Sequence, residues 1–537
     1  MPEPRAGAEP RSVAQKRLLS SHALGGEFGG SDCAFSFLGG VSMQQNSYRV
    51  LMVSAEVAPL AKVGGLADVA GALPKALHAL GHDARILMPA YPMVETDARW
   101  QIEPVSQFTL SIHPGWTENV SVKHLQLPSG VRVYLLQVGD WFANATESTK
   151  IYAVDPRAYV AFCRATVEWL AHADWTPQVV HCNDWHTALI PVYIRAYGTE
   201  RTANMATVFT IHNLAFQGVF ERTFFAELGL PDYWFDIEGL EFYGKVNLLK
   251  GALLASDRVN TVSPTYAAEI QTPEYGERLE GLLRRLADER RLTGILNGID
   301  YDEWNPETDP YLPAHYSADN LQGKAICRAD LQQACGWQPD PSKAVIGLVS
   351  RLTDQKGLDL IKALGAKLLQ LPIQLVLLGT GDPTYERYFR SLHKRHRAKV
   401  HATIGFDNAW AHRIYAGSDM FLMPSRFEPC GLGQMISLRY GTIPIVRQTG
   451  GLADSITPYD AARAAGNGFV FREYKPDALY EAVRQALEAF ADTPRWQMLV
   501  QRVMRQDWSW ARSARAYSTL YAEALENRAQ HAPAHAP

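Results

Sequence analysis

The chain has 537 residues, 47% hydrophobic and 20% charged, so it can bury more than one large core and a multi-domain protein is expected. A formal net charge of −4 excludes a global basic field, so we expect small or neutral partners and neither nucleic acid nor membrane. No apolar stretch approaches the roughly 20 residues of a spanning helix, and the six scattered cysteines lack CxxC spacing, so we predict a cytoplasmic chain without structural zinc.

Alternating short apolar runs and helical patterns begin at Arg49. Residues 1–48 lack a sustained apolar period, and we predict that they form an extension without fixed structure. Most of the apolar runs are too continuous for a half-exposed sheet, so the strands should be buried and parallel. The predicted strands of the first series are 49–57, 84–90, 131–138, 178–184, 206–213, 258–263 and 293–298.

A second series follows the polar, Pro-containing stretch 302–342. Its predicted strands are 344–350, 374–381, 399–406, 419–425, 442–448 and 467–473, and helices are predicted over 478–490 and 508–526. Two successive α/β sets predict two doubly wound, Rossmann-like domains that face a cleft. We expect a first domain over 49–301, a second over 302–505, a crossover helix over 506–526 that packs back on the first domain, and a disordered tail over 527–537.

Polar residues cluster where these predicted strands end, which is where open α/β sheets bind ligands. A lone histidine is more often a satisfied core or capping group, and a glycine pair is usually a turn. Eight such features across two domains nevertheless favour an interdomain ligand cleft. They are Glu56 with the loop 61–69, Asp184, His212, Asn297, Arg351 with Lys356, Gly379 with Gly381, Glu428, and Gly450 with Gly451.

Arg351 follows the apolar run 344–350 directly, Lys356 comes five positions later, and a helical pattern comes next. Two ordinary surface charges on a solvated loop are one interpretation. The other is an anion site, because the N–H groups and dipole at a helix N-terminus already favour phosphate. The choice between them depends on the rest of the chain.

Nine motifs together resemble the bacterial glycogen synthases, which are grouped with plant starch synthases as retaining glucosyltransferases of the GT-B architecture. The resemblance extends from about Arg49 to about Glu526. The motifs, in chain order, are KVGGLADV, HCNDWH, IHNLAFQG, GLEFYGKVNLLKG, TVSPTYAAEI, GILNGIDYDEWNP, SRLTDQKGLDL, PSRFEPCGLG and TGGLAD.

The resemblance implies that the second domain binds ADP-glucose and that the first binds the end of an α-1,4-glucan such as glycogen. It implies no metal and no cofactor, with Arg351 and Lys356 stabilising the departing diphosphate. The implied catalytic residues are Asp184, His212, Arg351, Lys356 and Glu428. The implied donor-binding residues are Lys62, Gly64, Gly65, Asn297, Ser350, Phe406, Gly450, Gly451 and Leu452, and Glu56 and Asp68 lie on the acceptor side.

The chain departs from the family pattern at several places. Ile436 occupies the second position of the Glu-x(7)-Glu pattern, Arg278 and Gly433 replace usual residues, and 139–162 matches poorly, which leaves the acceptor preference least secure.

Three other functions stay open. A nucleotide-dependent dehydrogenase would need a GxGxxG after a strand, which is missing. A silent glucan-binding protein would not need the charged residues that are present. A GT-B enzyme with another nucleotide-sugar or acceptor is the strongest alternative.

Overall fold

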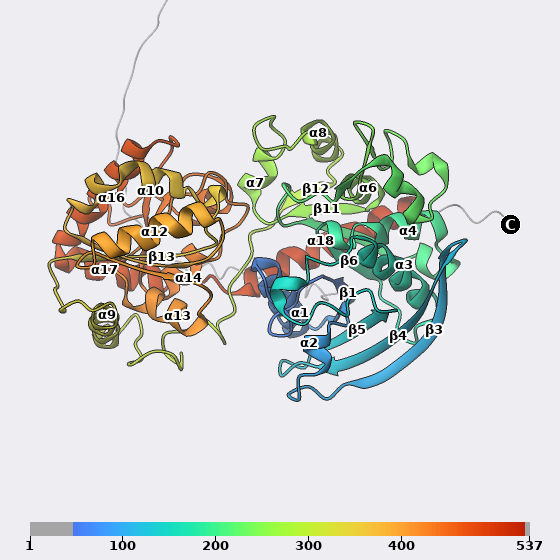
Figure 1. The fold of residues 1–537 in the computed structure, drawn as a ribbon, viewed down its shortest axis with the longest axis horizontal. Helices are drawn as coiled ribbons and strands as arrows, with labels where there is room; N and C mark the ends of the chain where they lie inside the picture. The colour runs from blue at the N-terminus through green and yellow to red at the C-terminus, as the bar shows by residue number, and fades with distance from the viewer. Residues whose placement is uncertain (1–46, 532–537) are drawn as a thin grey trace, which may run out of the picture. The chain divides into compact units, whose positions relative to one another are not determined.

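The computed structural model describes residues 47–531, so the predictions for 1–46 and 532–537 lie outside the described residues. Two α/β sheets dominate this part of the chain (Figure 1). Across 47–531, no helix is both long and apolar enough to span a bilayer.

The first sheet has nine strands in the order β12-β11-β7-β6-β1-β2-β5-β4-β3. The pairings from β12 to β5 are parallel, and β1, β6 and β7 are almost wholly buried, as continuous apolar runs require. The strands are β1 Arg49–Val53, β2 Asp83–Pro89, β3 Glu103–His113, β4 Trp116–Gln126, β5 Arg132–Val138, β6 Val179–Asn183, β7 Ala206–Ile211, β11 Arg258–Thr261 and β12 Leu292–Gly294.

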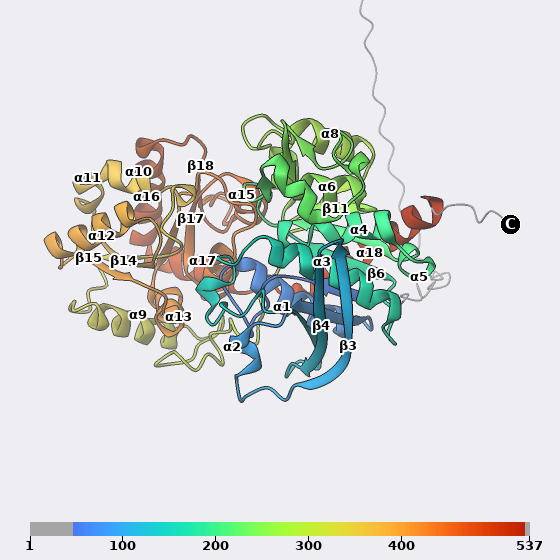
Figure 2. The same cartoon turned by 45° about the vertical axis from the view of Figure 1, so that its right-hand side comes forward.

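The antiparallel hairpin β3–β4 is absent from the prediction, which looked for continuous apolar runs. Along β3 and β4, buried and exposed residues alternate in part, as in a sheet that faces water on one side. The hairpin extends the parallel sheet at the free side of β5, and its two long strands stand out in Figure 2. A small three-stranded sheet was also not predicted; it consists of β8 Val219–Phe220, β10 Lys245–Asn247 and β9 Glu241–Phe242.

Helices join the strands of the first domain. They are α1 Gly65–Ala79, α2 Pro92–Glu95, α3 Arg157–His172, α4 Leu189–Tyr197, α5 Glu200–Ala203, α6 Leu248–Ala255, α7 Pro264–Glu269 and α8 Glu280–Asp288.

The second sheet has six strands in the order β15-β14-β13-β16-β17-β18, all paired in parallel. All six predicted strands of the second series are present, although each ends earlier than predicted. They are β13 Ala344–Val349, β14 Ile373–Gly379, β15 Val400–Ile404, β16 Met420–Met423, β17 Ile443–Arg447 and β18 Phe469–Phe471.

Helices lie on both faces of this second sheet, with α10 and α16 on one face and α9 and α13 on the other (Figures 1 and 2). This arrangement is the doubly wound architecture that the sequence predicted. The helices are α9 Gln322–Ala334, α10 Leu358–Leu364, α11 Ala366–Leu369, α12 Pro383–Arg395, α13 Asn408–Gly417, α14 Gly433–Arg439, α15 Gly450–Ser455, α16 Pro476–Ala491 and α17 Thr493–Met504.

The last helix, α18 Trp510–His531, contacts α1 and β7 of the first domain. Tyr521 contributes its hydroxyl to a 2.9 Å hydrogen bond with His181 Nδ1, and the amide of Asn260 donates to Tyr517. The helix continues past Glu526, where the sequence analysis expected a disordered tail to begin. Arg528 explains the difference, because its buried guanidinium donates to the carbonyl of Ala203.

Candidate active site

Asp184 and His212 lie at the carboxyl ends of the neighbouring strands β6 and β7. The backbone N–H of His212 donates to Asp184 Oδ1 at 2.8 Å. Asp184 has a φ of 56° and a ψ of 176°, a conformation that only glycine adopts readily. Such strain persists only where the surroundings impose it, and it is concentrated at functional sites.

The ring orientation of His212 is fixed by Asn183, whose side-chain oxygen lies 2.9 Å from His212 Nε2. An amide oxygen only accepts, so Nε2 carries the proton and Nδ1 is left as an acceptor. Burial lowers the pKa of His212 to about 3. The ring is therefore neutral at physiological pH, and it can accept a hydrogen bond from a substrate hydroxyl.

Asp184 is 9% exposed, and burial raises its pKa to about 7. Backbone N–H groups of His212 and Asn213 oppose the rise, and the nearby carboxyl of Glu56 adds to it. A carboxyl group with this pKa changes its charge within the physiological range.

Lys356 and Glu428 form an ion pair in the second domain, with Lys356 Nζ 2.9 and 2.7 Å from the two carboxylate oxygens. Their side chains are 16% and 6% exposed. Ser425 also donates to the carboxylate, at 2.9 Å. Two residues from separate motifs, 72 positions apart, are thereby brought into one buried pair.

Arg351 is exposed just after β13, and within residues 47–531 no ion pair involves it. Its Nη2 lies 3.5 Å from the side-chain oxygen of Gln355, at the limit of a hydrogen bond. The guanidinium is thus available to an anionic ligand. The predicted helix begins later than expected, because a 3-10 turn over Asp354–Lys356 precedes α10.

Glu56 binds the loop that carries Lys62. Its Oε2 accepts from the N–H groups of Val63 and Gly64 at 2.6 and 2.9 Å, and its Oε1 accepts from the Tyr152 hydroxyl at 2.8 Å. Burial raises the pKa of Glu56. The N–H groups of Val63 and Gly64 in this loop are therefore already satisfied by a carboxylate of the same domain.

Lys62 pairs with Asp68 at 2.5 Å, so one predicted donor-binding residue contacts one predicted acceptor-side residue. Gly65 opens helix α1. A side chain at Gly64 or Gly65 would meet only ordinary contacts, at 3.7 and 3.6 Å. Steric room therefore does not explain this glycine pair.

Gly450 and Gly451 are required by close packing against the Glu428 segment. A Cβ at Gly450 would lie 2.0 Å from the carbonyl oxygen of Glu428, and one at Gly451 would lie 2.1 Å from that of Cys430. Gly450 also has a φ of 44°, in the left-handed region. Leu452, the third residue of this turn, is fully buried.

Glu269 was not predicted, yet it holds the same turn. Its Oε1 accepts from Gly450 N at 3.0 Å and from Thr449 Oγ1 at 2.9 Å, and its Oε2 is buried without a hydrogen-bond partner among the described residues. Glu269 ends helix α7 of the first domain. Only the fold brings it to Gly450, 181 positions away.

Two predicted donor-binding residues keep unused polar atoms. Asn297 Oδ1 and Ser350 Oγ are both buried, and neither has a hydrogen-bond partner within the described chain. A buried acceptor or hydroxyl without a partner is rare and is commonly satisfied by a ligand or by water. Phe406 differs from both, because its side chain follows β15 and is 82% exposed, which leaves its ring free to stack.

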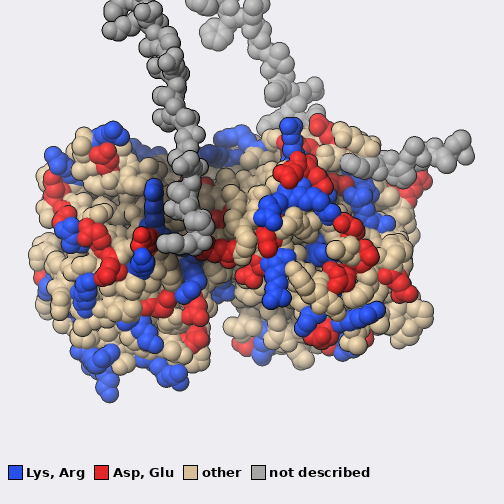
Figure 3. Space-filling view, turned by 90° about the horizontal axis from the view of Figure 1, so that it is seen from above, with Lys and Arg blue, Asp and Glu red and all other residues tan. Residues whose placement is uncertain are grey.

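Within residues 47–531, no group of three or more His, Cys, Asp or Glu side chains is placed to hold a metal ion. On the face shown in Figure 3, basic and acidic side chains are interspersed without a continuous basic area. Arg351 and Lys356 are cations that the candidate site offers to an anion.

Comparison with known proteins identifies the family of this chain. Residues 49–285 match the family described as starch synthase catalytic domain, and 336–495 match glycosyl transferases group 1. The chain is 47% identical over 491 residues to a glycogen synthase of Desulforudis audaxviator, covering 89% of this chain and 97% of that protein. The chain belongs to the glycogen and starch synthase family of glycosyltransferases.

Other relatives agree. A glycogen synthase of Thermotoga petrophila is 46% identical, with 89% of this chain and 99% of that protein covered. The catalytic domain of starch synthase IV from Arabidopsis thaliana, solved with ADP and acarbose bound, superimposes with a TM-score of 0.83 at 34% identity, over 90% of this chain and all of that one. The predicted family and the two-domain GT-B fold are both confirmed.

Proposed function

We propose that the chain transfers glucose from ADP-glucose to the non-reducing end of an α-1,4-glucan, with retention of the anomeric configuration, in the cytoplasm. The observation that carries this proposal is the buried pair of Lys356 and Glu428 beside the unpaired Arg351. The starch synthase relative that binds ADP and acarbose supports both substrate classes.

Arg351 and Lys356 bind the diphosphate in this proposal. When the bond between glucose C1 and the β-phosphate oxygen breaks, ADP leaves with its electron pair and extra negative charge. Lys356 then pairs with the phosphate and no longer with Glu428. Arg351 donates two parallel hydrogen bonds to the same diphosphate. Glu428, released from Lys356, accepts hydrogen bonds from donor hydroxyls.

The acceptor 4-hydroxyl forms the new bond to C1 and gives its proton to the departing phosphate. We place Asp184, His212 and Asn297 around the transferred glucose, because each offers an acceptor atom to sugar hydroxyls. Phe406 stacks on the adenine, and the turns at Gly64–Gly65 and Gly450–Leu452 line the donor, with Lys62 and Ser350 beside it. Glu56 and Asp68 support the acceptor side.

The test is incorporation of radiolabel into glycogen from ADP-glucose or UDP-glucose. We expect a clear preference for ADP-glucose in kcat/KM. Equal or reversed preference rejects the donor, and label from neither nucleotide rejects the reaction.

A further inference from the structure

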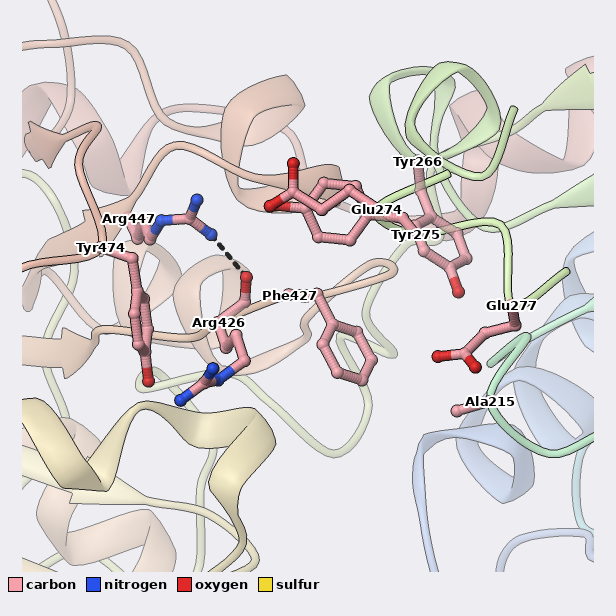
Figure 4. A pocket seen from close by; sticks show the side chains of 9 residues that line it. All are labelled: Ala215, Tyr266, Glu274, Tyr275, Glu277, Arg426, Phe427, Arg447 and Tyr474. Atoms are coloured by element: carbon pink, nitrogen blue, oxygen red, sulfur yellow. Dashed lines mark hydrogen bonds between the residues drawn. The ribbon is translucent and has the colours of Figure 1, made fainter. Parts of the chain in front are cut away.

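A cavity of about 330 Å³ lies between loops of the two sheets, apart from the residues assigned above (Figure 4). Glu274, Tyr275 and Glu277, which follow α7, line one side. Arg426 and Phe427 from the loop after β16, Arg447 at the end of β17, and Tyr474 after β18 line the other. None of these residues has a role in the proposed reaction.

Flat side chains form much of the wall. The guanidinium carbon of Arg426 lies 4.5 Å from the centre of the Tyr474 ring, and that of Arg447 lies 5.4 Å from it. Phe427 stands in the middle of the view in Figure 4, between this group and the Tyr266 side of the cavity. Tyr275 supplies a further ring. Such surfaces suit the apolar C–H faces of sugar rings as well as other flat ligands.

The charges of the cavity select among those ligands. Glu274 and Glu277 lie on one side, while Arg426 and Arg447 lie on the other. A phosphate or another anion that reached the two arginines would meet two carboxylates as well. A neutral polyhydroxyl chain instead finds both acceptors and donors for its hydroxyls.

The cavity shares its loops with the candidate active site. Phe427 directly precedes Glu428, and Ala215 stands three positions after His212. The backbone N–H of Leu214 donates to the Tyr266 hydroxyl at 3.1 Å, which links the His212 loop to the wall of the cavity. A chain that enters the active site can therefore contact the cavity with its more distant units.

We propose that this cavity binds glucose units of the acceptor glucan that lie beyond the reacting end, an inference that rests on the proposed function. Short acceptors do not reach it, and long acceptors gain affinity from it. The cavity therefore increases the affinity for long acceptors and takes no part in the transfer of glucose.

Tyr275→Ala and Tyr474→Ala test the proposal through acceptor kinetics. Each should raise the KM for glycogen and maltoheptaose roughly tenfold, as the loss of a buried aromatic contact does at an interface. The KM for ADP-glucose and the rate with maltose should stay within about twofold of wild type. Tyr275→Phe and Tyr474→Phe keep the rings and should behave as wild type.

Tyr480→Ala is the matched control, because Tyr480 has a comparable contact with Lys367 Nζ, 4.5 Å from the ring centre, and does not line the cavity. An unchanged KM for glycogen in both alanine variants overturns the proposal, as does an equal loss with maltose and with maltoheptaose. A raised KM for ADP-glucose alone would assign the cavity to the donor.

Direct binding of maltoheptaose by calorimetry separates this proposal from the proposed function. The wild-type chain should bind maltoheptaose more tightly than both alanine variants even if it transferred no glucose. Equal affinities would reject the cavity while leaving the transferase activity intact.

Discussion

Replacement of Asp184 by Asn should stabilise the folded protein at alkaline pH far more than at acid pH. Asp184 is buried at the end of β6, where desolvation raises its pKa to about 7. An asparagine keeps an oxygen that can accept from His212 N and cannot ionise.

The sign follows from proton binding. An unfolded aspartate has a pKa of about 3.9, so between about pH 4 and pH 7 the folded wild type holds a proton that the unfolded chain has lost. The stability of the wild type therefore falls as the pH rises through this window and is constant above it. With about 1.4 kcal/mol per pKa unit, the cost of ionising Asp184 is roughly 1.5 kcal/mol at pH 5 and about 4 kcal/mol at pH 8.5.

The variant does not have this cost. Its free energy of unfolding, relative to that of the wild type, should therefore be about 2–3 kcal/mol higher at pH 8.5 than at pH 5. Urea unfolding of both proteins, followed by circular dichroism at several pH values, measures the difference. Asp174→Asn, at an exposed aspartate of the same domain, should show no such trend. The reasoning would be refuted if the difference in unfolding free energy between Asp184→Asn and the wild type stayed constant or became smaller as the pH rose.

Two further substitutions separate the cations of the second domain. Lys356→Met should destabilise the protein by about 3 kcal/mol, because it leaves Glu428 buried without its partner. The double variant Lys356→Met/Glu428→Gln should regain most of that stability, as measured by urea unfolding, and should stay inactive. Stability equal to wild type in the single variant would contradict this. Arg351→Ala should change the unfolding free energy by less than about 0.5 kcal/mol, because Arg351 is exposed and unpaired, yet should lower kcat by roughly 10²–10³. Arg351→Lys should restore only part of the rate, since an ammonium cannot form the bidentate contact, and near-normal turnover in Arg351→Ala would place the diphosphate elsewhere.

The sequence predicted the parallel strands well because their burial on both faces requires continuous apolar runs. It missed β3 and β4, whose one-sided burial leaves only a partial alternation in Glu103–His113 and Trp116–Gln126. That alternation was a readable signal, typical of an antiparallel hairpin.

Motifs located candidate residues but not their partners. The pairing of Lys356 with Glu428 and the contact of Glu269 with Gly450 join positions far apart in the chain, so no local pattern encodes them. The sequence also does not show that Gly450 and Gly451 allow the turn to pack on the carbonyl groups of Glu428 and Cys430, because only the fold brings these segments together.

Carboxylates already bind several of the donor groups at the candidate site. Glu56 holds the N–H of Gly64, Glu269 holds the N–H of Gly450, and Glu428 holds Lys356. Without these carboxylates, buried donors and a buried ammonium would lack partners, at a cost of about 1–3 kcal/mol for each neutral group and more for the charge.

In the proposed reaction, the diphosphate must therefore exchange partners with these carboxylates. Each carboxylate that a phosphate displaces has to find another donor, and the hydroxyls of the bound glucose are suitable donors for Glu428. ADP without the attached glucose supplies the anion but not the glucose hydroxyls. The buried carboxylate of Glu428 therefore opposes the binding of ADP alone. In the proposed reaction, Arg351 needs no such exchange and is the group best placed to make the first contact with the nucleotide-sugar.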